Sequence, residues 1–364
     1  MVATTTILTE FENCRHQPGF ELSDFVAFYK RYNQIDRATL LALIGAETQY
    51  LARSGKMNEL SQLEKGLPDL TNQDIRKEIA DSLGDFLQSY CPLSANFGSL
   101  PITDNNLHFL SEIGRGGEGV VYEAIEVQIR RSVAVKVAFP ISLGLEAEAT
   151  VLGQLQHSNV PTLYSYGRLY DMPYFVFQLI RGKSLKSQCY EGAGLTVANA
   201  VSIVQKIGSA VEACHAQGIV HCDLNLSNVI TSHGNPYLID FGQARYSTTS
   251  PNRMFGTPGR TPPEFLDPNV AISPILGDVY CLGVMLYELL TQSLPQVCFG
   301  AEEIAKPIAP SQIRKAVDPE LEQICMRAIA NSPGDRFQSM KQFNSAINSW
   351  IDHQRHTPSV PQNC

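Results

Sequence analysis

The feature that most constrains the fold is a change in the spacing of the hydrophobic residues along the chain. Apolar and polar residues alternate in "LHFLSEIGRGGEGVVYEAIEV" and "SVAVKVAF", and the buried-looking run "PYFVFQLI" follows a helical "LGLEAEATVLGQLQ". A period of two predicts β-strands. From about residue 195 helical spacing dominates, with one strand-rich patch around "NVITSHGNPYLIDFG". A strand-rich half followed by a helix-rich half predicts an α+β unit with two lobes.

A mixture of Pro, Gly, Ser and Asn, "CPLSANFGSLPITDNN", separates this α+β unit from the N-terminal part of the chain. Before it, Leu40, Ile44 and Leu51 recur at helical spacing, and "TNQDIRKEIADSLGDFLQ" repeats the pattern. The sequence therefore predicts five segments: an N-terminal tail 1–20, a small helical domain 21–92, a linker 93–106, the α+β unit 107–352 and a C-terminal tail 353–364.

Composition limits the classes of function. At 364 residues and 44% hydrophobic content, the chain can bury a core without disulfides. Its net charge is −8, and no segment resembles the basic stripe of a nucleic-acid-binding protein. The nine Cys form no Cys-x-x-Cys pair, which argues against a zinc site and against an extracellular disulfide framework. We expect reduced thiols in the cytoplasm and no nucleic-acid partner.

No segment predicts membrane insertion. The N-terminus "MVATTTILTEFENC" lacks the basic region of a secretory signal. The longest strongly apolar run, "VYCLGVMLYELL", is shorter than the ~20 residues that a bilayer requires, so we expect a buried helix there. On this basis we expect a cytoplasmic protein whose input signal is intracellular.

Three glycines, Gly114, Gly116 and Gly119, lie between two predicted strands. A dinucleotide-binding fingerprint would have a helix after the last glycine. Glycine lets backbone amides approach phosphate groups closely, but a structural hairpin turn would use it equally well. Lys136 ends the strand "VAVK" 17 residues after Gly119. It is either a phosphate ligand or an edge residue with its ammonium group in solvent.

The stretch "HCDLNLSN" has the outline of a phosphotransferase catalytic loop. Asp223 follows a His by two residues and precedes Asn228 by five. The alternative role for Asp223 is to cap a helix or a turn.

These motifs are followed in order by "IDFG", "GTPGRTPPE", "GDVYCLGVMLYELL" and "SPGDRF". With this order and spacing, residues 107 to 350 resemble the eukaryotic-like (bacterial) Ser/Thr protein kinases. The resemblance implies a bilobal protein-kinase fold, with a β-rich N-lobe and a helical C-lobe, preceded by a small all-α domain. It also implies ATP- and Mg²⁺-dependent transfer of the γ-phosphate to Ser or Thr of a protein substrate.

The resemblance assigns roles to individual residues. Lys136 would hold the α- and β-phosphates, and Glu148 would steady it through a charge-assisted hydrogen bond. Glu146 is the competitor, but two residues away on a helix it points to another side. Asp223 would accept or orient the hydroxyl proton. The metal positions would be Asn228 and Asp240.

The resemblance also implies an adenine pocket, for which ordinary core packing is a compatible explanation. In this pocket Val121, Ala134 and Ile230 would sandwich the adenine and Phe177 would guard the pocket. Gln178 to Ile180 would form the hinge.

Two positions of the loop depart from the family. Cys222 stands where the family has the Arg that receives a phosphate from the activation loop. We therefore expect activity that does not depend on such phosphorylation. Asn225 stands where Ser/Thr members have Lys. The loss of one transition-state donor typically costs ~10²–10³ in rate, although Asn still donates a hydrogen bond. We expect an altered but competent loop, with reduced activity as one outcome.

Two other functions remain open. Asn225 motivates a pseudokinase that acts as a nucleotide-binding scaffold, whereas retention of Asn228 and Asp240 argues against it. A small-molecule phosphotransferase is the other alternative. Against it stand "GTPGRTPPE", Asp278 and Arg336, which resemble the peptide-docking C-lobe of protein kinases.

The C-lobe motifs carry further expectations. Glu264 and Arg336 are expected to form a buried ion pair. Thr257 favours Ser/Thr over Tyr acceptors. Arg260 replaces the usual Tyr, which suggests tolerance for acidic residues near the acceptor.

The N-terminal leader resembles, loosely, the helical segments that precede kinase domains in some planctomycete proteins, through "ARSG" and "LPDL". Three roles remain open: autoinhibition, substrate docking, or an intramolecular or dimer contact.

Overall fold

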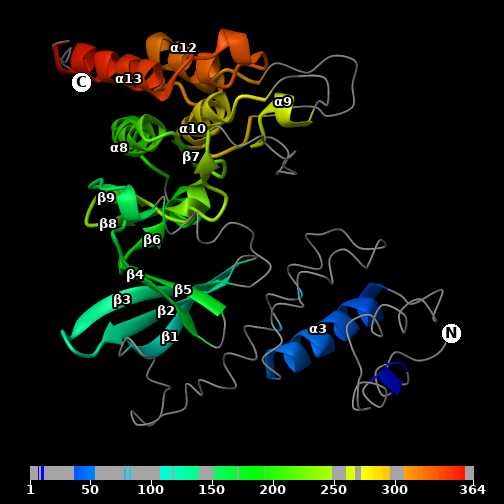
Figure 1. Ribbon diagram of the computed structural model, residues 1–364. Coiled ribbons are helices and arrows are strands. Elements are labelled where there is room, and N and C mark those ends of the chain that lie inside the picture. The colour runs from blue at the N-terminus through cyan, green and yellow to red at the C-terminus, as the bar shows by residue number, and fades with distance from the viewer. Residues whose placement is uncertain are drawn as a thin grey trace. The chain divides into compact units, whose positions relative to one another are not determined.

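The computed structural model forms two compact units. Residues 1–149 and 163–179 make the sheet unit, and residues 150–162 and 180–364 make the helical unit (Figure 1). The structure describes residues 7, 10–11, 37–53, 78, 82, 107–116, 119–138, 150, 152–169, 172–192, 194–247, 260–266, 272–295 and 307–356.

An antiparallel five-stranded sheet forms the described core of the sheet unit, in the order β1-β2-β3-β5-β4. The strands are β1 (Leu107–Gly116), β2 (Gly119–Glu126), β3 (Arg131–Ala138), β4 (Leu163–Leu169) and β5 (Met172–Gln178). One face is apolar because alternate residues of β2 and β3 are buried, among them Val120, Tyr122, Val133 and Val135. The alternation in the sequence predicted β1, β2 and β3 correctly, the buried-looking run "PYFVFQLI" predicted β5, and β4 was missed.

Helix α3 (Arg37–Arg53) is the described part of the N-terminal leader. Leu40, Ile44 and Leu51 are buried, as their helical spacing predicts. The described residues of the second predicted helix, Glu78 and Ser82, are helical and lie close to Gly45 of α3. The remainder of the predicted segments 21–92 and 93–106 lies outside the described residues.

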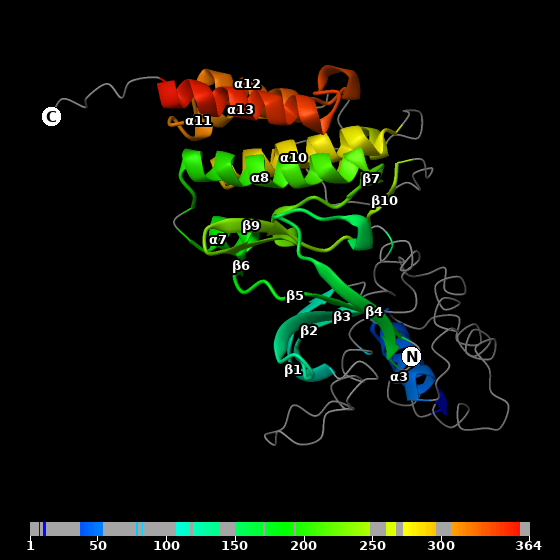
Figure 2. The same cartoon turned by 60° about the vertical axis from the view of Figure 1, so that its left-hand side comes forward.

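The helical unit is built on long helices. Figure 2 shows α8 (Val197–Ala216) and α10 (Pro274–Thr291) side by side beneath α12 (Pro319–Ala328) and α13 (Met340–His356). The side chains of Thr196, Ser273 and Asp318 cap the N-termini of α8, α10 and α12, which satisfies main-chain donors there. The shorter helices are α7 (Leu185–Tyr190), α9 (Pro263–Leu266), α11 (Pro310–Ile313) and the 3-10 turns η2 (Leu226–Asn228) and η3 (Pro333–Asp335).

Helix α10 is the central element of the helical unit. It is long and apolar enough to cross a membrane by length and composition, yet 78% of it is buried among the other elements. Gly283 lets it approach α12 closely, because a Cβ added there would lie 2.6 Å from Cβ of Ala328. The prediction of a buried helix at this position is confirmed.

Short strands precede and follow the loop between residues 221 and 225. β6 (Lys183–Ser184), β8 (Val229–Ser232) and β9 (Asn235–Leu238) form one antiparallel sheet, in the order β6-β8-β9. β7 (Ile219–Val220) pairs with β10 (Arg245–Tyr246). The strand-rich patch that the sequence predicted around residues 228–242 is therefore present as β8 and β9.

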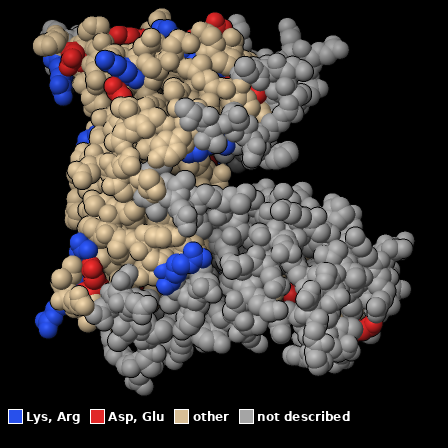
Figure 3. All heavy atoms as spheres, in the orientation of Figure 1, with Lys and Arg blue, Asp and Glu red and all other residues tan. Residues whose placement is uncertain are grey.

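The charged side chains of the described residues are scattered over the face drawn in Figure 3, in small groups of both signs among uncharged ones.

Candidate active site

The loop that follows β7 is held to α10 by one buried carboxylate. Oδ2 of Asp278 accepts from the main-chain nitrogen of His221 at 2.9 Å, and its Oδ1 accepts from that of Cys222 at 2.9 Å. The His215 ring, from α8, places Nε2 2.8 Å from Oδ2 of Asp278. The main chain just before Asp223 is therefore fixed by contacts with two long helices.

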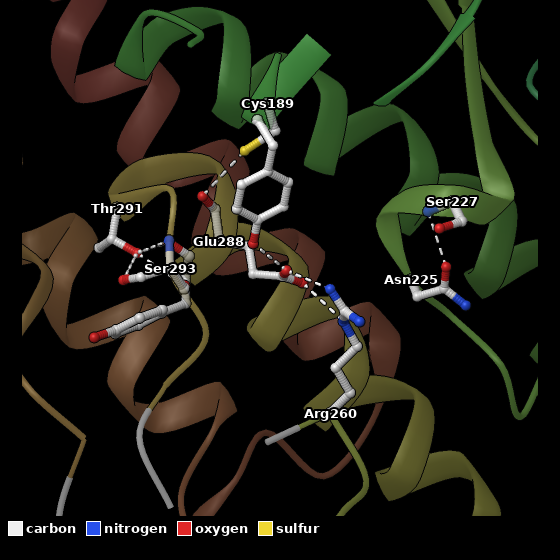
Figure 4. Close-up of polar contacts among 9 residues, drawn as sticks. Cys189, Asn225, Ser227, Arg260, Glu288, Thr291 and Ser293 are labelled. Atoms are coloured by element: carbon white, nitrogen blue, oxygen red, sulfur yellow. Dashed lines mark hydrogen bonds and ion pairs between the residues drawn. The ribbon is translucent and has the colours of Figure 1, made fainter. Parts of the chain in front are cut away.

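Asp223 has both carboxylate oxygens oriented by amides of the same loop. Nδ2 of Asn228 donates to Oδ2 at 2.8 Å and to the main-chain oxygen of Asp223 at 2.9 Å. Nδ2 of Asn225 donates to Oδ1 at 3.1 Å. Oδ1 of Asn225 in turn accepts from the main-chain nitrogen of Ser227 at 2.8 Å and caps η2 (Figure 4). The residue that replaces the expected cation thus makes three local hydrogen bonds, the third from its Nδ2 to the main-chain oxygen of Asp223 at 3.2 Å.

The surroundings of Asp223 favour its protonated form more than water does. Partial burial raises the pKa of Asp223, although the residue keeps an exposed edge. The hydrogen bonds from Asn228 and Asn225 oppose this rise in pKa, whereas the charge of Asp240 adds to it. A carboxylate with a raised pKa is a stronger proton acceptor, which suits a group that receives a hydroxyl proton.

His221 is a packed, neutral part of this loop. Its ring lies 4.7 Å from that of Phe241, centroid to centroid, and its Nδ1 accepts from the main-chain nitrogen of Asp223 at 3.3 Å. Burial lowers the pKa of His221, so the ring can remain an acceptor at neutral pH.

Asn228 and Asp240 lie on two segments that a main-chain hydrogen bond joins. The main-chain nitrogen of Ile239 donates to the main-chain oxygen of Asn228 at 2.8 Å, and Asp240 adopts a left-handed φ of 64°. Since the Asn228 amide turns its nitrogen to Asp223, its oxygen is directed away from that carboxylate. An amide oxygen and a carboxylate suit Mg²⁺, so these residues fit the predicted ion.

The described residues contain no group of three or more His, Cys, Asp or Glu side chains that could hold a metal ion. An ion bound by Asn228 and Asp240 would complete its coordination with phosphate oxygens and water.

In the sheet unit, five of the predicted nucleotide-binding residues share one face. Val121 lies opposite Gly114 on β1 and opposite Lys136 on β3. Ala134 lies opposite Phe177 on β5. Residues directly opposite in an antiparallel pair point to the same face. Lys136 is only 8% exposed on that face. Their roles toward ATP stay predictions.

The glycines of the loop differ in why glycine is needed. A Cβ on Gly119 would lie 2.3 Å from the main-chain oxygen of Val137, so sheet packing alone requires glycine there. A Cβ on Gly114 would meet nothing closer than Cβ of Val121, at 3.9 Å. Gly116 pairs with Gly119 in the register of β1 and β2. The hairpin explanation therefore accounts for Gly119 but not for Gly114.

The remaining predicted residues are divided between the two units. Gln178 ends β5, whereas Ile180 and Ile230 belong to the helical unit, the latter on β8. Glu148, Glu146 and Thr257 lie outside the described residues, so the pairing of Lys136 with Glu148 stays a prediction. Within the helix predicted over residues 143–156, residues 150 and 152–154 are helical.

The predicted ion pair of the C-lobe is present. Nη1 and Nη2 of Arg336 bind the two carboxylate oxygens of Glu264 at 2.7 Å each, with both side chains buried. Nε of Arg336 also donates to the main-chain oxygen of Ala330 at 2.8 Å. This bidentate pair joins the start of α9 to the segment around η3.

Cys222 contributes a neutral thiol where the family has Arg. Its Sγ accepts from Nε of Arg245 at 3.3 Å, and burial raises the pKa of Cys222 to about 12. The sulfur therefore stays protonated and behaves as a small packed group. Sequence reasoning did not single out Arg245 or His215, because neither lies in a local pattern that marks its partner.

Comparison with known proteins gives one consistent family. Residues 107–358 match the family model described as "Protein kinase domain". Similar curated proteins include serine/threonine-protein kinase Pkn1 of Myxococcus xanthus, 31% identical over 66% of this chain and 38% of its own length. PknD of Mycobacterium tuberculosis is 32% identical over 62% of this chain and 37% of its own length. The chain thus spans less than half the length of these relatives.

Proposed function

Since this chain belongs to the protein kinase family, we propose that it transfers the γ-phosphate of ATP to Ser or Thr hydroxyl groups of protein substrates. The observation that carries the proposal is the geometry of Asp223, whose carboxylate is held by two amides in a loop bonded to the buried Asp278. The likeness to Pkn1 and PknD supports the Ser/Thr class.

In the proposed reaction, Asp223 accepts the proton of the acceptor hydroxyl group while the oxygen of that hydroxyl group forms a bond to the γ-phosphorus. The bond from that phosphorus to the β–γ bridging oxygen breaks, and ADP leaves. Lys136 and the amides of the glycine loop bind the phosphates. Mg²⁺, when held by Asn228 and Asp240, offsets the negative charge of the phosphates.

We propose that the loop is competent despite Asn225. Its hydrogen bond to Oδ1 of Asp223 supports a role in orienting the base, and both metal positions are retained. We also propose activity without a phosphorylated activation loop, because the neutral Cys222 cannot bind a phosphate as Arg does. We also propose a helical domain at residues 21–92, which the buried side chains of α3 support. A cytoplasmic location is the remaining proposal.

The test is transfer from labelled ATP with and without Mg²⁺, scored on a generic basic protein and by autophosphorylation. We expect labelling by the wild type, its loss in Asp223→Ala, and only a change of rate in Asn225→Lys. If neither the wild type nor Asn225→Lys labels any acceptor although both still bind ATP, the result would favour a pseudokinase that acts as a nucleotide-binding scaffold. Labelling of small molecules but not of protein would favour a small-molecule phosphotransferase.

A further inference from the structure

A buried carboxylate near the C-terminal end of α10 is bound by two side chains from other segments. Glu288, whose side chain is 1% exposed, receives Nη2 of Arg260 at 2.7 Å and Nε of Arg260 at 3.3 Å. The Tyr190 hydroxyl donates to the same carboxylate at 2.7 Å. Figure 4 shows the guanidinium group directed at this carboxylate.

The three residues join separate parts of the helical unit. Arg260 belongs to the "GTPGRTPPE" segment just before α9, and Tyr190 is the last residue of α7. The main-chain oxygen of Arg260 also accepts from Sγ of Cys281 on α10 at 3.5 Å. Arg260 is therefore attached to α10 through its side chain and its main chain.

The buried negative charge of Glu288 explains why its bond to Arg260 matters for the structure. A carboxylate buried without a cation is unfavourable, so loss of the guanidinium group leaves the charge of Glu288 uncompensated. The hydrogen bond to Glu288 raises the pKa of Arg260, and burial raises the pKa of Tyr190, so both remain donors. Among the described residues, Arg260 provides the cation that pairs with the carboxylate of Glu288.

We propose that Arg260 is a positioning residue for the protein acceptor: bound to Glu288, it fixes the segment 260–266 in the conformation on which the acceptor docks. This inference rests on the proposed Ser/Thr kinase function. The paired charge of Arg260 also argues against the tolerance for acidic residues that its sequence position suggested, because Glu288 already compensates this charge.

A purely structural brace is the alternative to a positioning role. The loss of a brace would lower global stability and would change the KM for ATP and the KM for the acceptor alike. The loss of a positioning residue changes the acceptor step alone. Hydrogen exchange and the two KM values therefore separate the two roles.

The experiment uses the full chain as wild type, Arg260→Ala, Arg260→Lys and the control Arg355→Ala, which removes an exposed ion pair with Asp352 in the same unit. Amide exchange is measured at Thr261, Glu264, Phe265 and Leu266, since the two prolines between them carry no amide proton. KM is measured separately for ATP and for a protein acceptor. For Arg260→Ala we expect at least about tenfold faster exchange there, with α12 and α13 unchanged. We expect the acceptor KM to rise by about tenfold and the ATP KM to stay within about twofold.

Two further arms test the chemistry. Guanidinium ion at low millimolar concentration should restore slow exchange and the acceptor KM in Arg260→Ala, but not change the wild type. Arg260→Lys keeps the positive charge without the planar guanidinium group. Its exchange rate and its acceptor KM should therefore lie between those of wild type and Arg260→Ala. If Arg260→Ala does not fold, Arg260→Lys and Tyr190→Phe give the same graded comparison.

Wild-type exchange at residues 261–266 in Arg260→Ala would overturn the inference, whether or not the chain is active. A parallel rise of both KM values, or faster exchange throughout the helical unit, would also overturn it. Faster local exchange in a chain whose wild type labels no protein would instead reject the proposed function and leave the attachment of the segment standing.

Discussion

The amide nitrogen of Asn225 lies 3.1 Å from Oδ1 of Asp223. A neutral donor thus lies beside the carboxylate at the position where related Ser/Thr kinases carry Lys. Because the oxygen of the same amide caps η2, the side chain stabilises the loop as well as orienting Asp223.

Asn225→Asp tests these two contacts separately. The new carboxylate can still accept from the nitrogen of Ser227, but its charge should raise the pKa of Asp223 further. We expect kcat to fall and the acidic limb of the pH–rate profile to move to higher pH. Asn225→Ala loses every contact, including the hydrogen bond that lowers the pKa of Asp223, so kcat should fall roughly tenfold and the acidic limb should move in the same direction but less far. An unmoved acidic limb in Asn225→Asp would contradict this account.

Gly114→Ala and Gly119→Ala form a matched pair in the glycine loop. Gly119→Ala should lower the free energy of unfolding by about 1–3 kcal/mol, because its Cβ would overlap the main-chain oxygen of Val137. Gly114→Ala should change stability by less than about 0.5 kcal/mol but raise the KM for ATP. Urea denaturation and ATP titration check both. Equal loss of stability in the two variants would refute the distinction.

Arg336→Met should destabilise the helical unit by about 3–5 kcal/mol, because it leaves the carboxylate of Glu264 buried without its partner. Adding Glu264→Leu should recover part of the loss, since both charges are then removed. Urea denaturation measures the change, with Arg355→Ala as the exposed control expected to stay within about 0.5 kcal/mol.

His157 should make stability depend on pH. Its Nδ1 accepts from the main-chain nitrogen of Asn159 at 3.1 Å, and burial lowers its pKa from the usual 6.5. Since the unfolded chain binds the proton at higher pH, this contribution is complete above pH 6.5 and is lost as the pH falls through the lowered pKa. The Tm advantage of wild type over His157→Gln should therefore shrink between pH 7.5 and 5, whereas His356→Gln, at an exposed position at the end of α13, serves as control.

The sequence predicted those features that depend on local spacing. The alternation in β2 and β3, the apolar α10 and the order of motifs that pairs Glu264 with Arg336 all lie in short patterns. β4 was missed because its exposed Tyr164 and Ser165 interrupt the alternation of a half-buried strand.

Contacts between distant segments could not be predicted in the same way. Arg260 is 28 residues from Glu288, and no spacing rule relates a turn before α9 to the far end of α10. The different needs of Gly114 and Gly119 likewise depend on how β2 packs on β3, which the glycine pattern does not encode.

The bonds from Asp278 to the loop explain how Cys222 is tolerated there. Asp278 binds main-chain nitrogens, which every residue except proline provides. These bonds do not involve the side chain at position 222, so a residue that adopts the left-handed φ of 65° seen for Cys222 keeps them in place. A substitution at position 222 therefore alters the contact with Arg245 while the main chain before Asp223 stays bonded to α10.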